Sequence, residues 1–335
     1  MKKRVGFIGL FLMFYFAVNA QGVLNFKSPS YLQKGDTVAI IAPSGILKER
    51  AASIQKATEL LEGWGLNVAI GTHVFNQQYH FSGTDAERAV DFQKALDNPS
   101  IRAIWMARGG YGAVRILDRI NYFKFKEAPK WVVGFSDFTA FHNHIHNLGI
   151  ETIHGMMATS LEGDESEIVE TIGSFKKALF GKALQYTIAS SRYNRYSDSD
   201  AVKSIEGQLI GGNLTILASM LGSKSQISTS GKILFIEEIG EYKYAIDRML
   251  QSLKRAGYFK NVNAVIVGDI SNVLENSTVW GSSIEELILA VVPDNVPVLF
   301  DFPAGHEADN RALIFGRNVQ LQFGTDSCSL IFKEN

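Results

Sequence analysis

The sequence has few residues that constrain a chain covalently. Its 335 residues include one cysteine, Cys328, so no disulfide can form within the chain and no cysteine near the N-terminus can carry a lipid. With no base beside it in the sequence, Cys328 is most simply a small core or surface residue. Only seven residues are proline, and 46% are apolar against 20% charged. This composition is typical of a globular protein and excludes a disordered or fibrous one.

The apolar run near the N-terminus, VGFIGLFLMFYFAV, is too short to cross a bilayer. It has fourteen residues, whereas a spanning helix needs ~20. It follows the basic start MKKR and precedes small residues, a pattern typical of a secretory signal peptide over residues 1–20, cleaved after Ala20. A retained membrane anchor is the alternative. We expect an exported, periplasmic protein with no stable membrane association after cleavage.

An excess of positive charge is also absent. The 33 basic and 34 acidic residues give a net charge of −1. Removal of residues 1–20 takes away three basic residues, which leaves 30 against 34, or −4. This balance excludes a general nucleic-acid binder. An exported chain without disulfides depends on its hydrophobic core, and a chain of this length can form one.

The length and the pattern of apolar segments predict two domains. A single core rarely grows beyond about 250–300 residues. Strand-like and helix-like segments alternate from Thr37, which predicts an α/β domain with a doubly wound parallel sheet, flavodoxin-like or Rossmann-like, over residues 31–165. Residues 166–206 include a polar stretch without a clear period and are the expected linker. A second set of apolar segments predicts a smaller α/β domain over residues 207–335.

One glycine-rich segment follows a predicted strand of the first domain. Ligands of parallel α/β domains bind where strands end and helices begin. The three glycines of RGGYG, residues 108–112, would let backbone N–H groups approach a ligand or a developing negative charge. A tight turn between strand and helix is the alternative. The segment is neither GxGxxG nor a P-loop, so nucleotide binding is not favoured.

A serine follows the next predicted strand. The segment VVGFSDFTAF places Ser136 and Asp137 between an apolar strand and a helix, as in a nucleophile elbow, although the second glycine of GxSxG is missing. Alternatively, Ser136 caps the helix that begins near Phe138. The local sequence leaves both functions open. Helix capping is the best explanation for the carboxylate of Asp137.

The second domain supplies the partners that a nucleophilic serine needs. These are a base and a group that orients the base. His306 lies in the polar, glycine-containing loop AGHEADN, where it could exchange protons. Glu237 and Glu238 end the apolar strand of LFIEE, where a carboxylate would be partly buried. A set of serine, glutamate and histidine in this chain order is chemically complete.

The other histidines are weaker candidates. His142 and His146 in FHNHIHNLG share one face of a helix, but no HExxH motif accompanies them, so a polar helix face is favoured over a metal site. His154 follows another strand and either lines a cleft or is a structural histidine. No metal site is predicted.

Seven segments in this order resemble one family, the LD-carboxypeptidases of serine peptidase family S66. The family includes muramoyltetrapeptide carboxypeptidases and microcin C self-immunity peptidases. The resemblance covers about residues 31–320. The segments are GDTVAIIAPSG, RGGYGA, GFSDFTA, IHG, EGQLIGGNLT, LFIEEIGEYKYAIDRML and PAGHEADNRALIFG.

The resemblance implies an active site between the two domains, with no cofactor. The family serine falls on Ser136, its glutamate on Glu237 and its histidine on His306. The backbone N–H groups of Asp137 and of Gly110, or of its neighbour Gly109, would form the oxyanion hole. A homodimer is implied in the same way.

The substrate implied is a small peptide, the murein tetrapeptide, whose terminal D-alanine follows an L-configured centre of meso-diaminopimelate or lysine. Arg108 could bind the free carboxylate in two parallel hydrogen bonds, or it could be a structural arginine under its loop. Asn213 and Glu206 of EGQLIGGNLT are further candidates to line the cleft, as is His154.

Two other functions remain open. The chain could be a peptidase of the microcin-immunity kind that acts on aminoacyl or peptidyl nucleotides, with Tyr193 and Tyr196 available to stack on a ring. The signal peptide argues against this, because such toxic nucleotides act in the cytoplasm. A periplasmic protein that binds muropeptides without catalysis would also suit two domains around a cleft.

Overall fold

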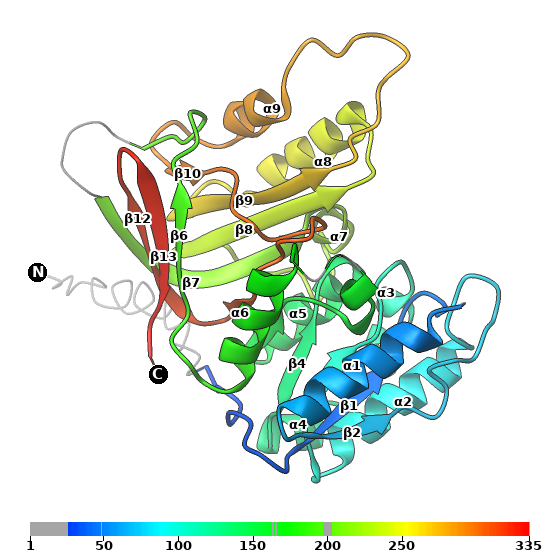
Figure 1. The fold of residues 1–335 in the computed structure, drawn as a ribbon. Helices are drawn as coiled ribbons and strands as arrows, with labels where there is room; N and C mark the ends of the chain where they lie inside the picture. The colour runs from blue at the N-terminus through cyan, green and yellow to red at the C-terminus, as the bar shows by residue number, and fades with distance from the viewer. Residues whose placement is uncertain (1–25, 48, 163, 165, 197–202, 335) are drawn as a thin grey trace, which may run out of the picture.

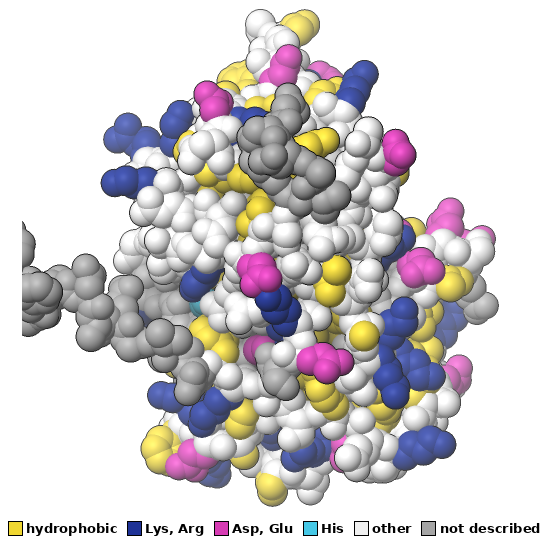
Figure 2. Space-filling view, turned by 90° about the vertical axis from the view of Figure 1, so that its left-hand side faces the viewer, with side chains coloured by type: hydrophobic (Ala, Val, Ile, Leu, Met, Phe, Trp, Pro, Cys, Tyr) yellow, Lys and Arg dark blue, Asp and Glu magenta, His cyan; other side chains and the backbone are white. Residues whose placement is uncertain are grey.

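The computed structural model describes residues 26–47, 49–162, 164, 166–196 and 203–334. These residues form two β-sheets with helices packed around them (Figure 1). The predicted signal peptide lies outside the described residues. Among the helices within them, none has both the length and the apolar character that a membrane span requires. On the face shown in Figure 2, acidic and basic side chains are interspersed.

The first sheet has the strand order β11-β5-β4-β3-β1-β2. Strands β1 to β5 run parallel, in the 2-1-3-4-5 order of flavodoxin-like folds, which confirms the predicted doubly wound class. The sixth strand, β11, comes from the C-terminal part of the chain and pairs antiparallel with β5. The strands are β1 (Thr37–Ile41), β2 (Asn67–Ile70), β3 (Ile101–Met106), β4 (Trp131–Gly134), β5 (Thr152–His154) and β11 (Leu313–Phe315).

Helices cover both faces of this sheet, so its central strands are almost entirely apolar; Arg102, near the start of β3, is the exposed exception in that strand. All four residues of β4 are buried, as expected for a parallel strand enclosed on both sides. Thr84 and Glu87 form a capping box that starts α2. The helices are α1 (Ala51–Gly63), α2 (Asp85–Asp97), α3 (Ala113–Leu117), α4 (Phe123–Glu127), α5 (Thr139–Asn147) and α6 (Val169–Leu179), with 3₁₀ turns η1 (Ser136–Phe138) and η2 (Ala158–Glu162).

The second sheet has the order β10-β9-β8-β7-β12-β13-β6. Its β7 to β10 half is parallel and its other half antiparallel. Cys328 is buried on β13. The strands are β6 (Gln185–Ala189), β7 (Lys203–Asn213), β8 (Lys232–Ile239), β9 (Ala264–Ser271), β10 (Val298–Leu299), β12 (Asn318–Phe323) and β13 (Ser327–Phe332); the helices are α7 (Leu214–Ser219), α8 (Lys243–Arg255) and α9 (Ile284–Val291).

The chain passes between the two sheets more than once. Residues 166–206, the expected linker, contain α6 and the strand β6, which pairs with β13. Strand β11 returns from the second half of the chain to the first sheet. One buried cluster contains both Trp105 of the first sheet and Phe235 of the second. The two sheets therefore pack against one shared hydrophobic core. This packing fixes the position of one sheet relative to the other.

Candidate active site

Ser136 occupies a tight turn between β4 and α5. Its φ is +60°, in the left-handed region that side chains other than glycine seldom adopt. At Gly134, two residues earlier, an added Cβ would lie 2.8 Å from Met106 Cγ and 3.1 Å from the ring of Phe138. This strand–turn–helix geometry is that of a nucleophile elbow. Ser136 makes no capping hydrogen bond, and Phe138 is the N-cap of α5, so the capping alternative for Ser136 is wrong.

The carboxylate of Asp137 links the elbow to two other loops. It is buried, and its Oδ2 accepts hydrogen bonds from Ser44 Oγ at 2.6 Å and from the N–H of Ala113 at 2.8 Å. Burial raises the pKa of Asp137, although these two hydrogen bonds lower it in part. Asp137 thus caps α3 rather than the helix that it precedes. The expectation of local capping failed because its partners lie far away in the sequence.

The glycine loop after β3 packs directly against the serine. An added Cβ at Gly109 would lie 3.3 Å from both Cβ and Oγ of Ser136, and Gly110 has a φ of +101°. Gly109 O accepts a hydrogen bond from the N–H of Gly45, in the loop after β1. These loops lie at the β1/β3 switch point, where flavodoxin-like folds bind ligands. The structure therefore brings Gly109 and Gly110 beside Ser136.

Arg88 of α2 forms hydrogen bonds with these loops, and the sequence did not predict this role for it. Its side chain is buried, and Nη1 donates to the carbonyls of Pro43 and Gly112, the latter at 2.9 Å. Its Nη2 donates to Asp85. The available signal was an arginine beside Ala89 on the apolar face of an amphipathic helix.

Glu237 and His306 form a buried pair at the end of β8. Glu237 Oε2 lies 2.7 Å from His306 Nδ1, and Glu237 is fully buried. Burial raises the pKa of Glu237, and the hydrogen bond with His306 lowers it in part. Burial alone would lower the pKa of His306, but the hydrogen bond and charge of Glu237 outweigh it, so the pKa of His306 is raised. An imidazole held in this way can take up a proton on Nε2.

The neighbouring acid, Glu238, has different partners. Its carboxylate accepts from Asn213 Nδ2 at 3.0 Å, from the N–H of Thr215 at 2.7 Å and from its neighbour Ile239 at 2.8 Å. It therefore stabilises the start of α7. Of the two adjacent glutamates, Glu237 is the one that contacts His306.

Two further acids surround the His306 loop. Gly305, with φ of +147°, packs so closely that an added Cβ would lie 2.8 Å from Asp269 Cβ. Asp269 Oδ2 accepts from the N–H of Glu307 at 3.2 Å, and Ser271 Oγ donates to the Glu307 carboxylate. Burial raises the pKa of Asp269 to about 6. The sequence signal was an acid at the end of an apolar strand, in VIVGD.

Contacts between the sheets bring the elbow and the acid–base pair together. An added Cβ at Gly212 would lie 2.5 Å from Thr139 Oγ1, and the N–H of Asn213 donates to that oxygen at 3.0 Å. Thr139 starts α5, just after the elbow, and Asn213 lies opposite Glu237 in the β7–β8 register. The ring centroids of Phe135 and His306 are 4.9 Å apart. His306 therefore lies next to the residue that precedes Ser136.

Comparison with known proteins agrees with this geometry. Residues 38–155 match the model of the LD-carboxypeptidase N-terminal domain, and residues 206–321 match that of its C-terminal domain. The chain belongs to the LD-carboxypeptidase family. It is 34% identical over 300 residues to a probable murein peptide carboxypeptidase of Bacillus subtilis, covering 89% of this chain and 92% of that protein.

Solved structures of this LD-carboxypeptidase fold include two informative neighbours. The muramoyltetrapeptide carboxypeptidase from Oxalobacter formigenes superposes with a TM-score of 0.76 at 28% identity, covering 89% of this chain and 99% of that one. MccF in complex with glutamyl sulfamoyl guanosine superposes with a TM-score of 0.79 at 24% identity, covering 92% and 99%. At that identity, the second likeness shows the fold alone.

The remaining residues predicted to line the cleft differ in position. Asn213 is buried beside Glu237; its Oδ1 accepts from the N–H of Ile216 and caps α7. Glu206 lies seven residues earlier on β7, roughly 23 Å along the strand, and forms an ion pair with Lys333. Glu206 is therefore outside the site, and its predicted place in the cleft is wrong.

Arg108 and His154 both have structural contacts. Arg108 Nη1 donates to the carbonyl of Ile46 at 2.6 Å, and burial lowers the pKa of Arg108. This guanidinium supports the loop after β1 rather than its own loop, and its predicted contact with a substrate carboxylate stays a prediction. His154 is fully buried, with its ring centroid 5.1 Å from that of Phe235 and 5.3 Å from that of Phe315. Burial places its pKa well below the usual value, so His154 is neutral and does not line the cleft.

The histidines of α5 face separate partners. His142 Nδ1 lies 2.7 Å from Thr152 Oγ1, and its Nε2 lies 2.8 Å from Gly134 O. His146 Nε2 lies 2.9 Å from Lys232 Nζ. Within the described ranges, no group of three or more His, Cys, Asp or Glu side chains is arranged to hold a metal ion.

Proposed function

We propose that this chain is a serine LD-carboxypeptidase of murein tetrapeptides. It hydrolyses the amide between the L-centre of meso-diaminopimelate or lysine and the terminal D-alanine. The observation that carries this proposal is the 2.7 Å contact between buried Glu237 and His306 beside the strained serine turn. Membership of a family that includes a probable murein peptide carboxypeptidase supports the substrate class.

The proposed reaction has two steps. His306 Nε2 takes the proton of Ser136 Oγ as that oxygen attacks the scissile carbonyl. The backbone N–H groups of Asp137 and Gly110 (or Gly109) stabilise the oxyanion, and Glu237 holds the imidazolium through its Nδ1–H. His306 then protonates the leaving amine of D-alanine. Water, deprotonated by His306, cleaves the acyl–serine ester and releases the tripeptide.

The support for this machinery is local rigidity. The elbow, the glycine loop and the loop after β1 are held by the buried Asp137 carboxylate and by Arg88. Fixed donors need no reorganisation when charge develops on the substrate, and one such donor contributes about 2.7–4 kcal/mol to lowering a barrier. The loops around Ser136 thus suit acyl transfer better than ligand capture alone.

A nucleotide substrate of the microcin-immunity kind is less well supported. Tyr193 and Tyr196 were the rings available to stack on a base. Tyr193 has its ring centroid 6.2 Å from Phe300, and the ring of Tyr196 is stacked on Phe323 at 5.1 Å. Both rings are thus engaged by the chain's own phenylalanines. We further propose that the enzyme acts in the periplasm as a homodimer after loss of residues 1–20.

The test is release of free amino acid by the chain starting at Gln21. It is incubated with tetrapeptides that carry diaminopimelate or lysine at position three, with a pentapeptide ending in D-alanyl-D-alanine, and with an aminoacyl sulfamoyl nucleoside. We expect D-alanine from a tetrapeptide and none from the pentapeptide. Cleavage of the aminoacyl sulfamoyl nucleoside alone would indicate a peptidase of the microcin-immunity kind instead. Binding of tetrapeptide without product would indicate a binding protein, and cell fractionation tests the compartment.

A further inference from the structure

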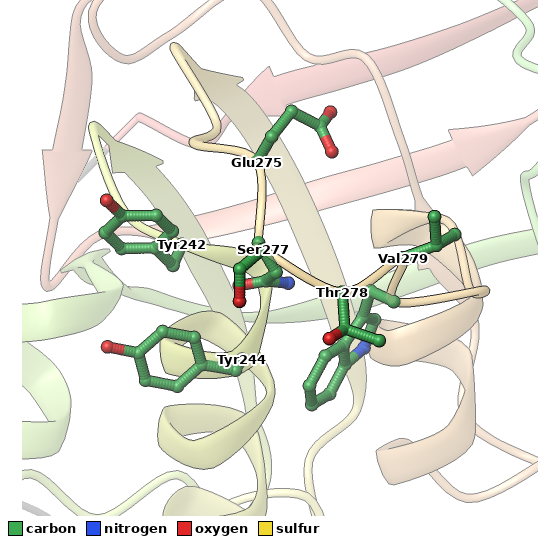
Figure 3. A pocket seen from close by; sticks show the side chains of 8 residues that line it. Tyr242, Tyr244, Glu275, Ser277, Thr278 and Val279 are labelled. Carbon is green, nitrogen blue, oxygen red and sulfur yellow. The ribbon is translucent and has the colours of Figure 1, made fainter.

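A hollow lies at the same edge of the second sheet as Glu237. It is formed between the start of α8 and the loop that joins β9 to α9 (Figure 3). Its volume is about 960 Å³, within the usual range for a small-molecule site. Figure 3 shows the rings of Tyr242 and Tyr244 on one side and the loop with Ser277, Thr278 and Val279 on the other. Nothing in the mechanism above uses this hollow.

Aromatic surface is unusually exposed there. The rings of Tyr242 and Tyr244 are stacked, with centroids 5.6 Å apart and an interplanar angle of 25°. These two residues and Trp280 are 40%, 44% and 38% exposed, and Val279 is 90% exposed. Exposed apolar groups gathered at one place commonly mark a binding site. Aromatic faces next to polar loop side chains suit a ligand with both C–H faces and hydroxyl groups, which is the surface of a sugar ring.

One amide in the hollow has no partner. Both Oδ1 and Nδ2 of Asn276 are shielded from solvent and form no hydrogen bond among the described residues. Leaving shielded polar atoms without partners is unfavourable, because they have lost their hydrogen bonds to water and gained none in exchange. A ligand amide, with one N–H and one C=O, would satisfy both atoms. Ser277 and Thr278 add hydroxyl groups beside it. An N-acetylated sugar carries this combination.

A short segment of chain connects the hollow to Glu237. Tyr242 follows Glu237 by five residues, at most about 18 Å of chain, and pairs with Leu274 in a bridge that continues the β8–β9 ladder. In murein the N-acetylmuramoyl group precedes the scissile amide by three amino acids, about 11 Å of extended chain plus the lactyl link. The chain separation between Glu237 and the hollow is thus of the same order as that between the sugar and the scissile amide in a muropeptide.

We propose that this hollow binds the N-acetylated sugar of the substrate, so that the enzyme prefers a disaccharide tetrapeptide over the free tetrapeptide. The ring of Trp280 stacks on the sugar, and Asn276 binds its acetamido group. Tyr244, whose ring is stacked on Tyr242 and lies under the guanidinium of Arg248, contacts the sugar through its edge and hydroxyl group. The inference rests on the proposed function for its peptide part only. The sugar site itself can be tested without hydrolysis.

The kinetic test compares kcat/KM for disaccharide tetrapeptide with that for free tetrapeptide. We expect the wild-type ratio to be about fivefold to tenfold, carried by KM, and to fall towards one in Tyr244→Ala and Trp280→Ala. Phe123→Ala is the matched control, because it also removes an exposed aromatic side chain. Phe123 is 68% exposed and lies on α4, a helix of the first domain. This control should keep the wild-type ratio. A wild-type ratio near one, or a ratio unchanged in both variants, would overturn the proposal.

The binding test uses Ser136→Ala and the peptide-free disaccharide of N-acetylglucosamine and N-acetylmuramic acid. The indole N–H resonance of Trp280, assigned with Trp280→Phe, should shift on addition of the sugar. A shift without any hydrolysis of tetrapeptide by wild type would support the sugar site while refuting the proposed reaction. An unmoved resonance would overturn the sugar site alone. This includes the case in which a second copy of the chain covers the hollow, which a fall in the molecular mass of the Trp280→Ala variant in solution would reveal.

Discussion

Replacement of Glu237 by glutamine changes the group that holds the catalytic imidazole without changing its size. The carboxylate is fully buried, and Oε2 accepts from His306 Nδ1 at 2.7 Å. Glutamine keeps one acceptor but loses the charge that stabilises an imidazolium and that selects the productive tautomer. The corresponding change in a Ser-His-Asp triad lowers kcat about 10⁴-fold. That factor corresponds to about 5.5 kcal/mol in the activation barrier.

The same substitution has a defined effect on pH dependence. Glu237 raises the pKa of His306, so the acid limb of kcat/KM should lie above pH 6.5 in wild type. Loss of the charge lowers the pKa of His306, and the limb of the residual activity should move to lower pH. The interaction with charged Glu237 stabilises protonated His306, so its contribution to folding is present below pH 6.5 and is lost as pH rises through the raised pKa.

The free energy of unfolding should distinguish Glu237→Gln from Glu238→Gln. Without the Glu237 carboxylate, burial lowers the pKa of His306, so at pH 8 neither member of the pair carries a charge in the variant. Glu237→Gln should therefore unfold within about 1 kcal/mol of wild type. Glu238→Gln disturbs two hydrogen bonds at the start of α7 and one to Ile239 of β8, and should cost about 1–3 kcal/mol, with activity within about tenfold of wild type. D-alanine release and urea denaturation measure both. Near-normal activity of Glu237→Gln, or an acid limb moved upward, would refute the reasoning.

Further predictions follow from the loops around the nucleophile. Ser136→Gly should abolish D-alanine release yet raise the free energy of unfolding by about 1 kcal/mol, because glycine tolerates φ of +60°; a loss of stability in urea would contradict this. Gly109→Ala should lower kcat about 10²-fold with little change in KM, because its Cβ would lie 3.3 Å from Ser136 Oγ; steady-state rates decide. Arg88→Met should cost about 3 kcal/mol and lower kcat, since two loop carbonyls lose their donor; unchanged values of both would contradict the role given to Arg88. A chelator should leave the rate unchanged, as continuous D-alanine assays with and without EDTA would show.

The alternation of strands and helices was enough to predict the first sheet, because each of its parallel strands is followed locally by a covering helix. The sequence could not predict β11. This strand has three residues, and its antiparallel pairing with β5 joins positions more than 150 residues apart. Such pairing depends on how the second domain packs against the first, and the local hydrophobic pattern of the sequence gives no information about it.

The candidate site shows the same division. Residues at strand ends, such as Ser136 and Glu237, were found because strand ends gather at one edge of a sheet. Glu206 was misplaced because a matching segment can span most of a strand: Asn213 ends β7, whereas Glu206 lies seven residues earlier. The partners of Asp137 were missed because Ser44 lies 93 residues away. Only folding brings such groups together.

The central claim is that Ser136 attacks the amide before D-alanine. The most direct measurement is D-alanine release from a murein tetrapeptide by wild type and by Ser136→Ala, with circular dichroism to show that both are folded. Wild type should release D-alanine, and the variant should be slower by at least about 10³-fold, since only its oxyanion hole and binding contacts remain. Release by the folded variant at a rate near that of wild type would contradict the account.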